Sequence, residues 1–347
     1  MIKLFKEEEF PQYIDHHLPF LDRDTEYSFL APYIQTSEKE IIKLLGKEAF
    51  SIAQSAFDAE EPTSKEKDIL FHFRQPILIN AYRLYAPTAD LSHGNNGRKM
   101  RNKEDETHAF EWMLNRDDEN QERAYYRELD NLIYFLEDFK VWRDSETFKK
   151  MKSNLVHSTE VFNEHFPIES RLLFIKITPG LKQAQKKHIA PLIGKDLFQK
   201  LQDSLLTYTL EDLLYYPNEE PNQPTTPEEE DQVTLQPLEK EVLELCQEAC
   251  VYFSLEWAMK RLKVTLFPKG ILQNYVGDRQ ISKAKKVPEF LETQLAAQEF
   301  HKDAYFVLNT IESTLAEMKQ ESAEEATKED ILEDFINFDN DNEFMST

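Results

Sequence analysis

The feature that most constrains this chain is a sequence repeat. The segment EIIKLLGKEAF (40–50) returns about 150 residues later as HIAPLIGKDLF (188–198). When Gly46 is aligned with Gly194, the apolar and charged positions on both sides coincide: Ile41 with Ile189, Leu44 with Leu192, Leu45 with Ile193, Lys47 with Lys195, Glu48 with Asp196 and Phe50 with Phe198. Such an echo indicates two copies of one structural unit, and the fold has to accommodate both.

The repeat extends well beyond these two segments. Phe10 lies opposite Phe162 in a leading segment, Gly97 aligns with Gly277, and further pairs follow near the end of each copy: Ala124-Tyr125-Tyr126 with Ala304-Tyr305-Phe306, and Leu129 to Leu132 with Leu308 to Ile311. The order is the same in both copies: a short leading helix, a helix ending at a glycine, a long apolar helix, a loop with glycine and a closing helix. The sequence therefore predicts a tandem duplication.

The pattern within each copy is helical. In the first copy Ile34, Ile41 and Leu45 recur on one face, which is the period of an amphipathic helix. The next segments, 69–86 and 242–262, are apolar nearly all round, as expected of a central helix surrounded by others. Only 7 glycines occur in 347 residues, which favours long helices over turn-rich β structure. We predict an all-α fold with short loop or hairpin insertions after the central helices.

Gly46 and Gly194 read as helix stops, because glycine adopts a left-handed conformation without a Cβ penalty. Pro76, inside the first central helix, is expected either to kink that helix or to mark its true start. The predicted domains are a first helical repeat at 1–140, a helical connector at 141–158, a second helical repeat at 159–319 with an acidic, proline-rich insertion at 215–232, and an acidic flexible tail at 320–347.

Charge and composition exclude several classes of protein. The net charge of −24 argues against general nucleic-acid binding, because neutralising phosphates requires clustered Lys and Arg. The first residues form no secretory signal, and no apolar run reaches the ~18–20 residues of a membrane span, so we expect a cytoplasmic protein without membrane contact. Cys246 and Cys250 lie four residues apart in a helical stretch, where we expect buried, reduced thiols.

No motif indicates an enzyme. The chain lacks G-x-S-x-G, G-x-x-x-x-G-K-[ST] and G-x-G-x-x-G. The segment DHHLPFLDRD (15–24) is the richest in metal-ligating types, but adjacent histidines do not share a helix face and no second ligand pair completes the set. His188 falls on an apolar stripe and is expected to be a core or edge residue. We expect no cofactor, no metal and no enzymatic activity, with a site at 15–24 as the enzymatic alternative.

Two features suggest interactions instead. A basic cluster follows Gly97 in the first copy and Gly277 in the second, and the acidic tail carries an apolar cluster. The basic clusters suit an acidic partner surface, such as a neighbouring copy, or DNA passing close by; the alternative is a solvated helix start. The tail suits a partner that binds a short helix. The candidate interaction residues are Arg98, Lys99, Arg101 and Lys103; Arg279, Lys283, Lys285 and Lys286; and Ile331, Leu332, Phe335, Ile336 and Phe338.

These landmarks resemble an uncharacterised family of prophage-like loci whose members often carry the motif twice. The resemblance rests on FLAPYI (29–34), IIKLLGKEAF (41–50), the apolar helix, the glycine loop and AYYRELDNLIYFLE (124–137), and it covers most of residues 1–318. More distantly, the unit is similar to the head–tail connector proteins of long-tailed phages, all-α subunits that form a ring beneath the portal.

The resemblance implies a structural subunit of a phage or phage-like particle. Its expected partners are neighbouring copies of itself in a homo-oligomeric ring and the portal and tail or stopper proteins, with transient proximity to DNA. No catalytic residue comes with the resemblance. The duplication, the insertion at 215–232 and the acidic tail depart from the simple connector. A monomeric helical adaptor that binds one partner through its acidic-hydrophobic tail is the alternative.

Overall fold

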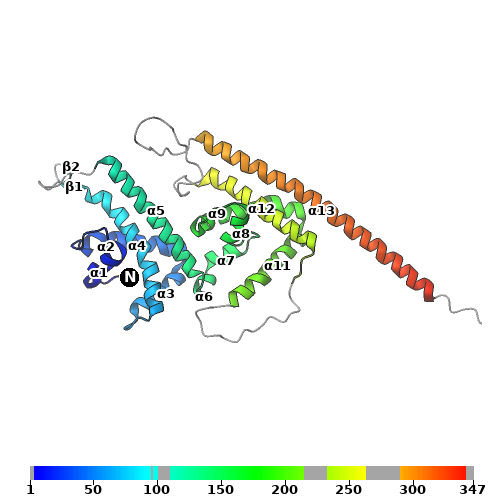
Figure 1. Ribbon diagram of the computed structural model, residues 1–347, viewed down its shortest axis with the longest axis horizontal. Coiled ribbons are helices and arrows are strands. Elements are labelled where there is room, and N and C mark those ends of the chain that lie inside the picture. The colour runs from blue at the N-terminus through cyan, green and yellow to red at the C-terminus, as the bar shows by residue number, and fades with distance from the viewer. Residues whose placement is uncertain (1–3, 95–96, 101–109, 215–232, 263–289, 341–347) are drawn as a thin grey trace, which may run out of the picture. The chain divides into compact units, whose positions relative to one another are not determined.

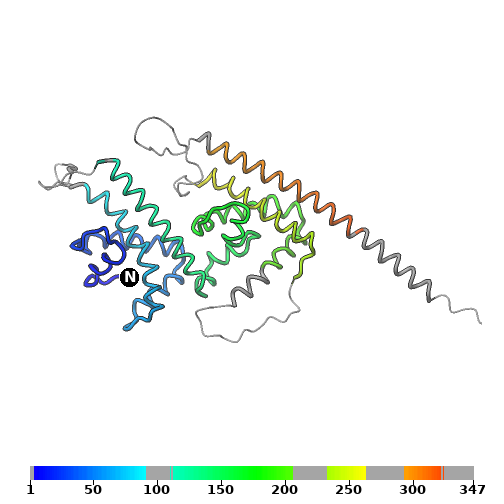
Figure 2. Tube along the Cα trace, in the orientation of Figure 1, coloured from blue at the N-terminus to red at the C-terminus, as the bar shows by residue number. Residues whose placement is uncertain are grey.

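The computed structural model describes residues 4–94, 97–100, 110–214, 233–262 and 290–340 (Figures 1 and 2). The described chain consists of helices and one two-stranded hairpin. It divides into two compact units. Unit 1 is mainly Met1–Met151 with Glu169–Lys176, and unit 2 is mainly Lys152–Ile168, Ile177–Leu210 and Thr226–Thr347. The predicted all-α fold with an internal duplication is confirmed.

Unit 1 is organised around its central helix, α4, which contacts α1, α2, α3 and α5. These neighbours explain why the sequence of α4 is apolar nearly all round. The helix begins at a capping box, in which the Thr63 hydroxyl accepts from the Glu66 amide and the Glu66 carboxylate accepts from the Thr63 amide. The elements are η1 (Glu7–Glu9), α1 (Phe10–His17), α2 (Tyr27–Leu45), α3 (Lys47–Asp58), α4 (Ser64–Ala89), β1 (Leu91–Gly94), β2 (Gly97–Met100), α5 (Glu111–Leu136), α6 (Lys140–Arg143) and α7 (Glu146–Lys152).

Unit 2 repeats this order around α12, which contacts α8, η2 and α13. Its capping box joins Gln236 and Glu239, and Pro237 occupies the first helical position. The elements are α8 (Thr159–His165), α9 (Arg171–Ala184), the π-helix η2 (Gln185–Ile189), α10 (Ala190–Ile193), α11 (Lys195–Leu214), α12 (Pro237–Arg261) and α13 (Phe290–Asn340). Both central helices are longer than their apolar segments, and Pro76 lies inside α4 instead of at its start.

The two aligned glycines join consecutive helices in the same way. Gly46 has φ 95° and ψ 161°, and Gly194 has φ 83° and ψ 162°. The predicted positive φ is confirmed, but ψ is extended instead of left-handed helical. This region of backbone space is essentially restricted to glycine. Each glycine therefore ends one helix and lets α3 or α11 begin at the next residue.

A π-helix absorbs a difference in length between the two copies. The interval from Pro179 to Gly194 is one residue longer than that from Pro32 to Gly46. The extra residue coincides with η2, which fits the occurrence of π-turns as single-turn bulges inside α-helices. The buried positions of the two copies still correspond on both sides of this extra residue. Leu30 and Ile34 correspond to Ile177 and Leu181 before it, Ile41 and Leu45 correspond to Ile189 and Ile193 after it, and all eight are buried.

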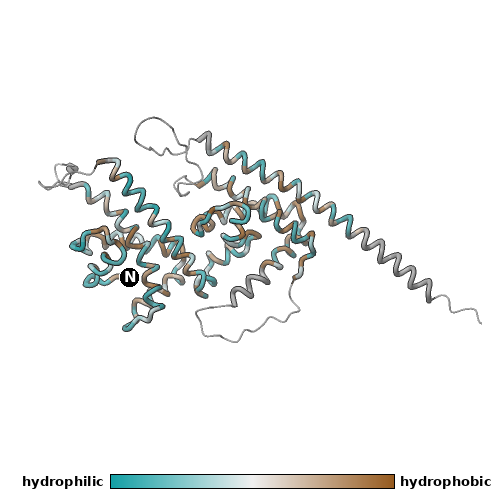
Figure 3. Tube along the Cα trace, in the orientation of Figure 1, coloured by the Kyte–Doolittle hydropathy of each residue, from teal (hydrophilic) through white to brown (hydrophobic). Residues whose placement is uncertain are grey.

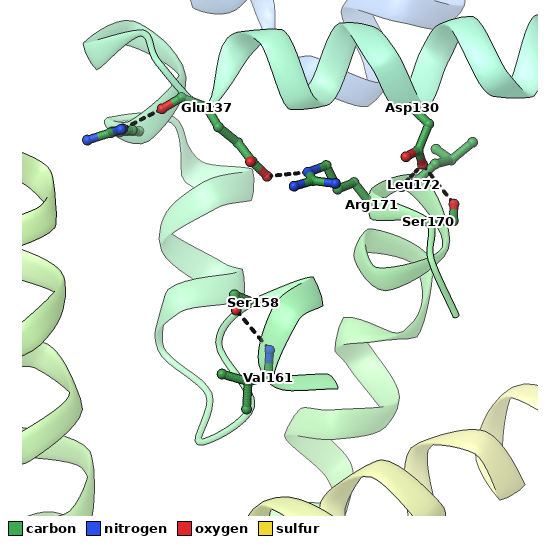
Figure 4. A network of polar contacts seen from close by, with 8 residues as sticks. Asp130, Glu137, Ser158, Val161, Ser170, Arg171 and Leu172 are labelled. Atoms are coloured by element: carbon green, nitrogen blue, oxygen red, sulfur yellow. Dashed lines mark hydrogen bonds and ion pairs between the residues drawn. The ribbon is translucent and has the colours of Figure 1, made fainter. Parts of the chain in front are cut away.

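The beginning of α9, up to Lys176, groups with unit 1, whereas the rest of the helix groups with unit 2. Side chains of α5 bind the first turn of α9 (Figure 4). The Asp130 carboxylate accepts from the Ser170 hydroxyl at 2.8 Å and from the Leu172 amide at 3.0 Å. Arg171 Nε donates to the Glu137 carboxylate at 2.9 Å, and its guanidinium lies 4.4 Å from the centre of the Tyr134 ring. A carboxylate is favourable at this position because the N-terminus of a helix carries unpaired amides and a partial positive charge.

The connector differs from the predicted helix. Residues 140–152 form two short helices, α6 and α7, separated at Asp144 and Ser145. The break occurs where the Ser145 hydroxyl accepts from the Phe148 amide at 3.2 Å, which begins a new helix. Trp142 and Phe148 are buried with their ring centres 6.1 Å apart, and residues up to Met151 group with unit 1.

The acidic segment after residue 320 begins within α13, which continues to Asn340. Its first part, ESAEEATKED (321–330), is composed mainly of strong helix formers. The insertion at 215–232 and residues 341–347 lie outside the described residues.

Candidate interaction surfaces

Of the two predicted basic clusters, only the start of the first lies in the described residues. In unit 1 the antiparallel hairpin β1–β2 confirms the predicted hairpin, and its register pairs Arg98 with His93 and Lys99 with Ser92. The remaining predicted basic residues lie outside the described residues: Arg101, Lys103, Arg279, Lys283, Lys285 and Lys286. The structure therefore places only the beginning of the first cluster.

The apolar cluster of the tail lies on the last turns of α13. Ile331, Leu332, Phe335, Ile336 and Phe338 all fall before Asn340, where the helix ends. Their separations of three, four and seven residues are those of one side of a helix. The backbone of this segment is helical.

The closing helices, α5 and α13, carry a set of exposed apolar side chains that the sequence analysis did not single out. The group is Trp112, Met113, Leu114 and Tyr134 on α5 and Leu295, Tyr305 and Phe306 on α13, and Phe110 caps α5. Trp112 is 58% exposed and Phe306 is 74% exposed. Figure 3 shows that much of α5 is hydrophilic.

The seam between the central and closing helices has opposite charge order in the two units. In unit 1, Arg83 Nη1 lies 3.9 Å from the Glu122 carboxylate. In unit 2, the Glu256 carboxylate lies 3.0 Å from His301 Nδ1 and also contacts Lys260. A basic residue on α4 thus faces an acidic one on α5, whereas an acidic residue on α12 faces an imidazole on α13. The chemistry of this seam therefore differs between the two repeats.

His188 lies at this seam of unit 2, on the π-helix. Its ring stacks on Phe253 with a centre separation of 3.9 Å and an interplanar angle of 10°. The Tyr305 ring meets both residues edge-on, at 6.3 Å from His188 and 5.7 Å from Phe253. Burial lowers the pKa of His188, which the nearby Glu256 carboxylate opposes. The prediction of a core or edge histidine is confirmed.

The His/Asp segment at 15–24 does not gather its side chains around one point. His16 Nδ1 lies 2.7 Å from the Gln12 carbonyl oxygen, and His17 Nδ1 lies 2.5 Å from the Gln75 side-chain oxygen. Burial lowers the pKa of His17 to about 4, so this ring is neutral at pH 7. In the part of the chain that the structure describes, no three His, Cys, Asp or Glu side chains are arranged to hold a metal ion.

The two cysteines are free and buried, as predicted. Burial raises the pKa of Cys246 to about 12. Burial also raises the pKa of Cys250 well above its ordinary value, and the neighbouring Cys246 adds to that shift. Both thiols are therefore protonated and unreactive at neutral pH. None of the described helices combines the length and the apolar character of a membrane span.

Fold and surfaces together define a class: an all-α protein of two duplicated helical units that expose apolar side chains on their closing helices. One family model matches the chain twice, at residues 39–151 and 189–321, once in each repeat and together over more than half of the chain. The chain therefore belongs to the family of unknown function DUF6712. No curated protein and no solved structure matches it.

Proposed function

We propose that this protein is a non-enzymatic structural subunit that assembles into a ring at the head–tail junction of a phage or phage-like particle. The observation that carries the proposal is the exposed apolar set on the closing helices of both units. Phe110, Trp112, Met113 and Leu114 follow one another closely at the start of α5, and grouped exposed apolar side chains mark interaction surfaces. A second copy of the chain is the proposed partner, because heterologous contacts between identical subunits close into a ring when the rotation fits.

The duplication supports the same proposal. Each copy of the chain brings two closing helices, so one subunit offers two contact surfaces of related build. The basic clusters that follow Gly97 and Gly277 in the sequence supply charge opposite to the net charge of −24. In the proposed ring these clusters meet acidic faces of the next copy, and the acidic character of the whole keeps passing DNA from binding. The portal and the tail or stopper proteins are the proposed partners above and below.

The test is the mass of the protein in solution by light scattering after size exclusion, together with negative-stain images. We expect a ring-sized multiple of the 41.0 kDa chain. Trp112→Glu and Phe306→Glu should each reduce that mass while circular dichroism keeps the helical signal. The matched control is Phe71→Glu, because Phe71 is 47% exposed but lies on α4. A monomer at every concentration, or equal loss of assembly in the control, contradicts the proposed contact.

The basic clusters have a separate test. Replacing Arg98, Lys99, Arg101 and Lys103 together by Glu should weaken assembly and make the remainder less sensitive to salt, because opposite charges are screened within about 10 Å at 0.1 M salt. Assembly that is unchanged by the four substitutions removes these residues from the interface.

The second candidate function is a monomeric adaptor that binds one partner through residues 331–338. The helical backbone of α13 up to Asn340 favours it, since amphipathic helices dock in apolar grooves of partners. This version predicts a monomer whose binding is lost on removal of 321–347 while the melting of the helical units is unchanged. Loss of ring assembly on the same truncation assigns the segment to the ring instead.

A further inference from the structure

Both repeats hold the main chain of one buried leucine by side chains of two helices, a feature that is independent of the proposed ring. In unit 1 this leucine is Leu4, which is fully buried just before η1. Glu38 of α2 is 6% exposed, and its carboxyl interacts with the Leu4 backbone. Arg74 Nε of α4 donates to the Leu4 carbonyl oxygen at 2.9 Å. We call these three residues the Leu4 clamp.

Unit 2 contains the same arrangement, the Leu155 clamp. The Gln185 side-chain oxygen accepts from the Leu155 amide at 2.9 Å, and Gln247 Nε2 donates to the Leu155 carbonyl oxygen at 3.0 Å. Gln185 is fixed in turn by its own Nε2, which donates to the Asn154 side-chain oxygen at 2.6 Å. Leu155 is fully buried, like Leu4.

The side chains that hold the two leucines occupy equivalent positions. Glu38 and Gln185 stand six residues after the paired helix prolines, Pro32 and Pro179, and both are buried. Arg74 and Gln247 each follow directly after a buried residue of the central helix, and the buried residues around them repeat with one spacing: Ile69, Phe73, Ile77 and Leu78 in α4, and Val242, Cys246, Cys250 and Val251 in α12. The two positions from which the leucine is held are therefore the same in both copies.

The two clamps differ in one decisive respect. Gln185 has no titratable proton, whereas Glu38 does, and the Glu38 side chain is enclosed when the N-terminal segment is in place. We propose that the Leu4 clamp is a proton-sensitive latch, which holds the N-terminal segment (residues 4–18) while Glu38 is neutral and loosens when Glu38 ionises, whereas the Leu155 clamp holds its segment at any pH.

Burial favours the neutral form of the Glu38 carboxyl. It raises the pKa of Glu38 to about 7, although the Leu4 backbone hydrogen bond opposes the shift. Movement of the segment admits water and returns the pKa toward its ordinary value of 4.5. Ionisation therefore favours opening, and the opening equilibrium should rise about 70-fold between about pH 5 and about pH 8.

Other ionisable groups around the latch do not reproduce this effect. On α2, burial raises the pKa of Tyr27, with Glu38 and Glu7 of η1 adding to the shift, so Tyr27 remains neutral over this range. On the carbonyl side, Arg74 lies 4.5 Å from the centre of the Tyr13 ring and stays charged, although burial lowers its pKa. The Tyr13 hydroxyl donates to the Glu9 carboxylate at 2.5 Å, and this hydrogen bond lowers the pKa of Glu9, so Glu9 stays ionised between about pH 5 and about pH 8.

A histidine within the segment, His17, is the other group whose titration could open it. His17 of α1 is buried against Gln75 of α4, and burial lowers its pKa to about 4. Its protonation would open the segment on acidification, which is the opposite direction. The sign of the pH dependence therefore separates the two groups.

The test is hydrogen–deuterium exchange of the whole chain, measured at the peptides that contain Leu4 and Leu155 and corrected for intrinsic exchange. We expect protection of the Leu4 peptide to fall by about 70-fold from about pH 5 to about pH 8, while protection of the Leu155 peptide stays constant as an internal control. Glu38→Gln copies the second repeat and should make the Leu4 peptide insensitive to pH.

The reverse substitution gives an independent check. Gln185→Glu should introduce the same loss of protection at the Leu155 peptide with rising pH, and folding of this variant is followed by circular dichroism at each pH. The proposal is overturned if the Leu4 peptide of the unmodified protein shows no pH dependence, or if Glu38→Gln retains it. Equal pH dependence at both peptides of the unmodified protein also overturns it.

Discussion

The backbone conformation of Gly46 and Gly194 leads to a quantitative prediction about the helix joints. Both glycines have positive φ, 95° and 83°, with ψ near 160°. Side chains other than hydrogen are strained there whatever space surrounds them. A Cβ on Gly46 would come 3.2 Å from the flexible carboxylate Oε2 of Glu48, whereas a Cβ on Gly194 would meet nothing within 4 Å. The pair therefore separates backbone strain from steric contact.

The expected cost follows from two opposing effects. Strain at such a φ and ψ is of the order of 1–3 kcal/mol. The loss of unfolded-state entropy on replacing Gly by Ala offsets roughly 0.4–1 kcal/mol of this. We expect Gly46→Ala and Gly194→Ala each to lower the free energy of unfolding by about 1–2 kcal/mol. That corresponds to a fall of roughly 2–8 °C in the melting temperature of a unit of this size.

Calorimetry of the two variants and the parent chain provides the assay, with Lys47→Ala as the matched control. Lys47 is exposed, occupies the first turn of α3 directly after Gly46, and should change the free energy of unfolding by no more than about 0.5 kcal/mol. If Gly194→Ala is neutral or stabilising, backbone strain is not what reserves this position for glycine. A large effect at Gly46 alone would assign the requirement to the contact with Glu48.

Three further predictions concern the core, the α9 cap and the pH dependence of stability. Cys246 and Cys250 should react with a thiol reagent only after unfolding, because both are buried and the Cys246 pKa is raised to about 12; rapid labelling of the native chain would contradict their placement. Asp130→Ala should lower the free energy of unfolding of unit 1 by about 1–2 kcal/mol, measured by denaturant titration, because the first turn of α9 loses a capping acceptor. The Glu38 pKa is higher in the folded state than its ordinary 4.5, so stability should decrease as pH rises from about 4.5 to about 7, by up to about 3 kcal/mol, and this slope should be absent in Glu38→Gln.

Much of the fold was determined by local sequence. The echo around Gly46 and Gly194 predicted the duplication, and apolar residues with helical spacing predicted the helices, because burial of one face imposes that spacing. The apolar segments predicted the central helices, whose surroundings require apolar residues on every side. Buried cysteines and an edge position for His188 followed from the same pattern.

Three other features of the fold went beyond the predictions from the sequence. The break between α6 and α7, the helical course of α13 to Asn340 and the π-helix at 185–189 were not predicted. The π-helix left a trace in the sequence, since the interval from Pro179 to Gly194 is one residue longer than its counterpart, but a single extra residue fits a loop as well as a helix. Its position was decided by packing, which keeps the buried faces of α9 and α10 in register.

Some of the candidate interaction surfaces were found from the sequence, and others only from the tertiary structure. The sequence by itself identified charged and apolar clusters, because composition is visible without coordinates. It did not identify the exposed set on α5 and α13, since exposure depends on which side of a helix its neighbours cover. Nor did it reveal the clamps, because Leu4 is 70 residues from Arg74 and Leu155 is 92 residues from Gln247, and only the tertiary structure brings such groups within hydrogen-bond distance.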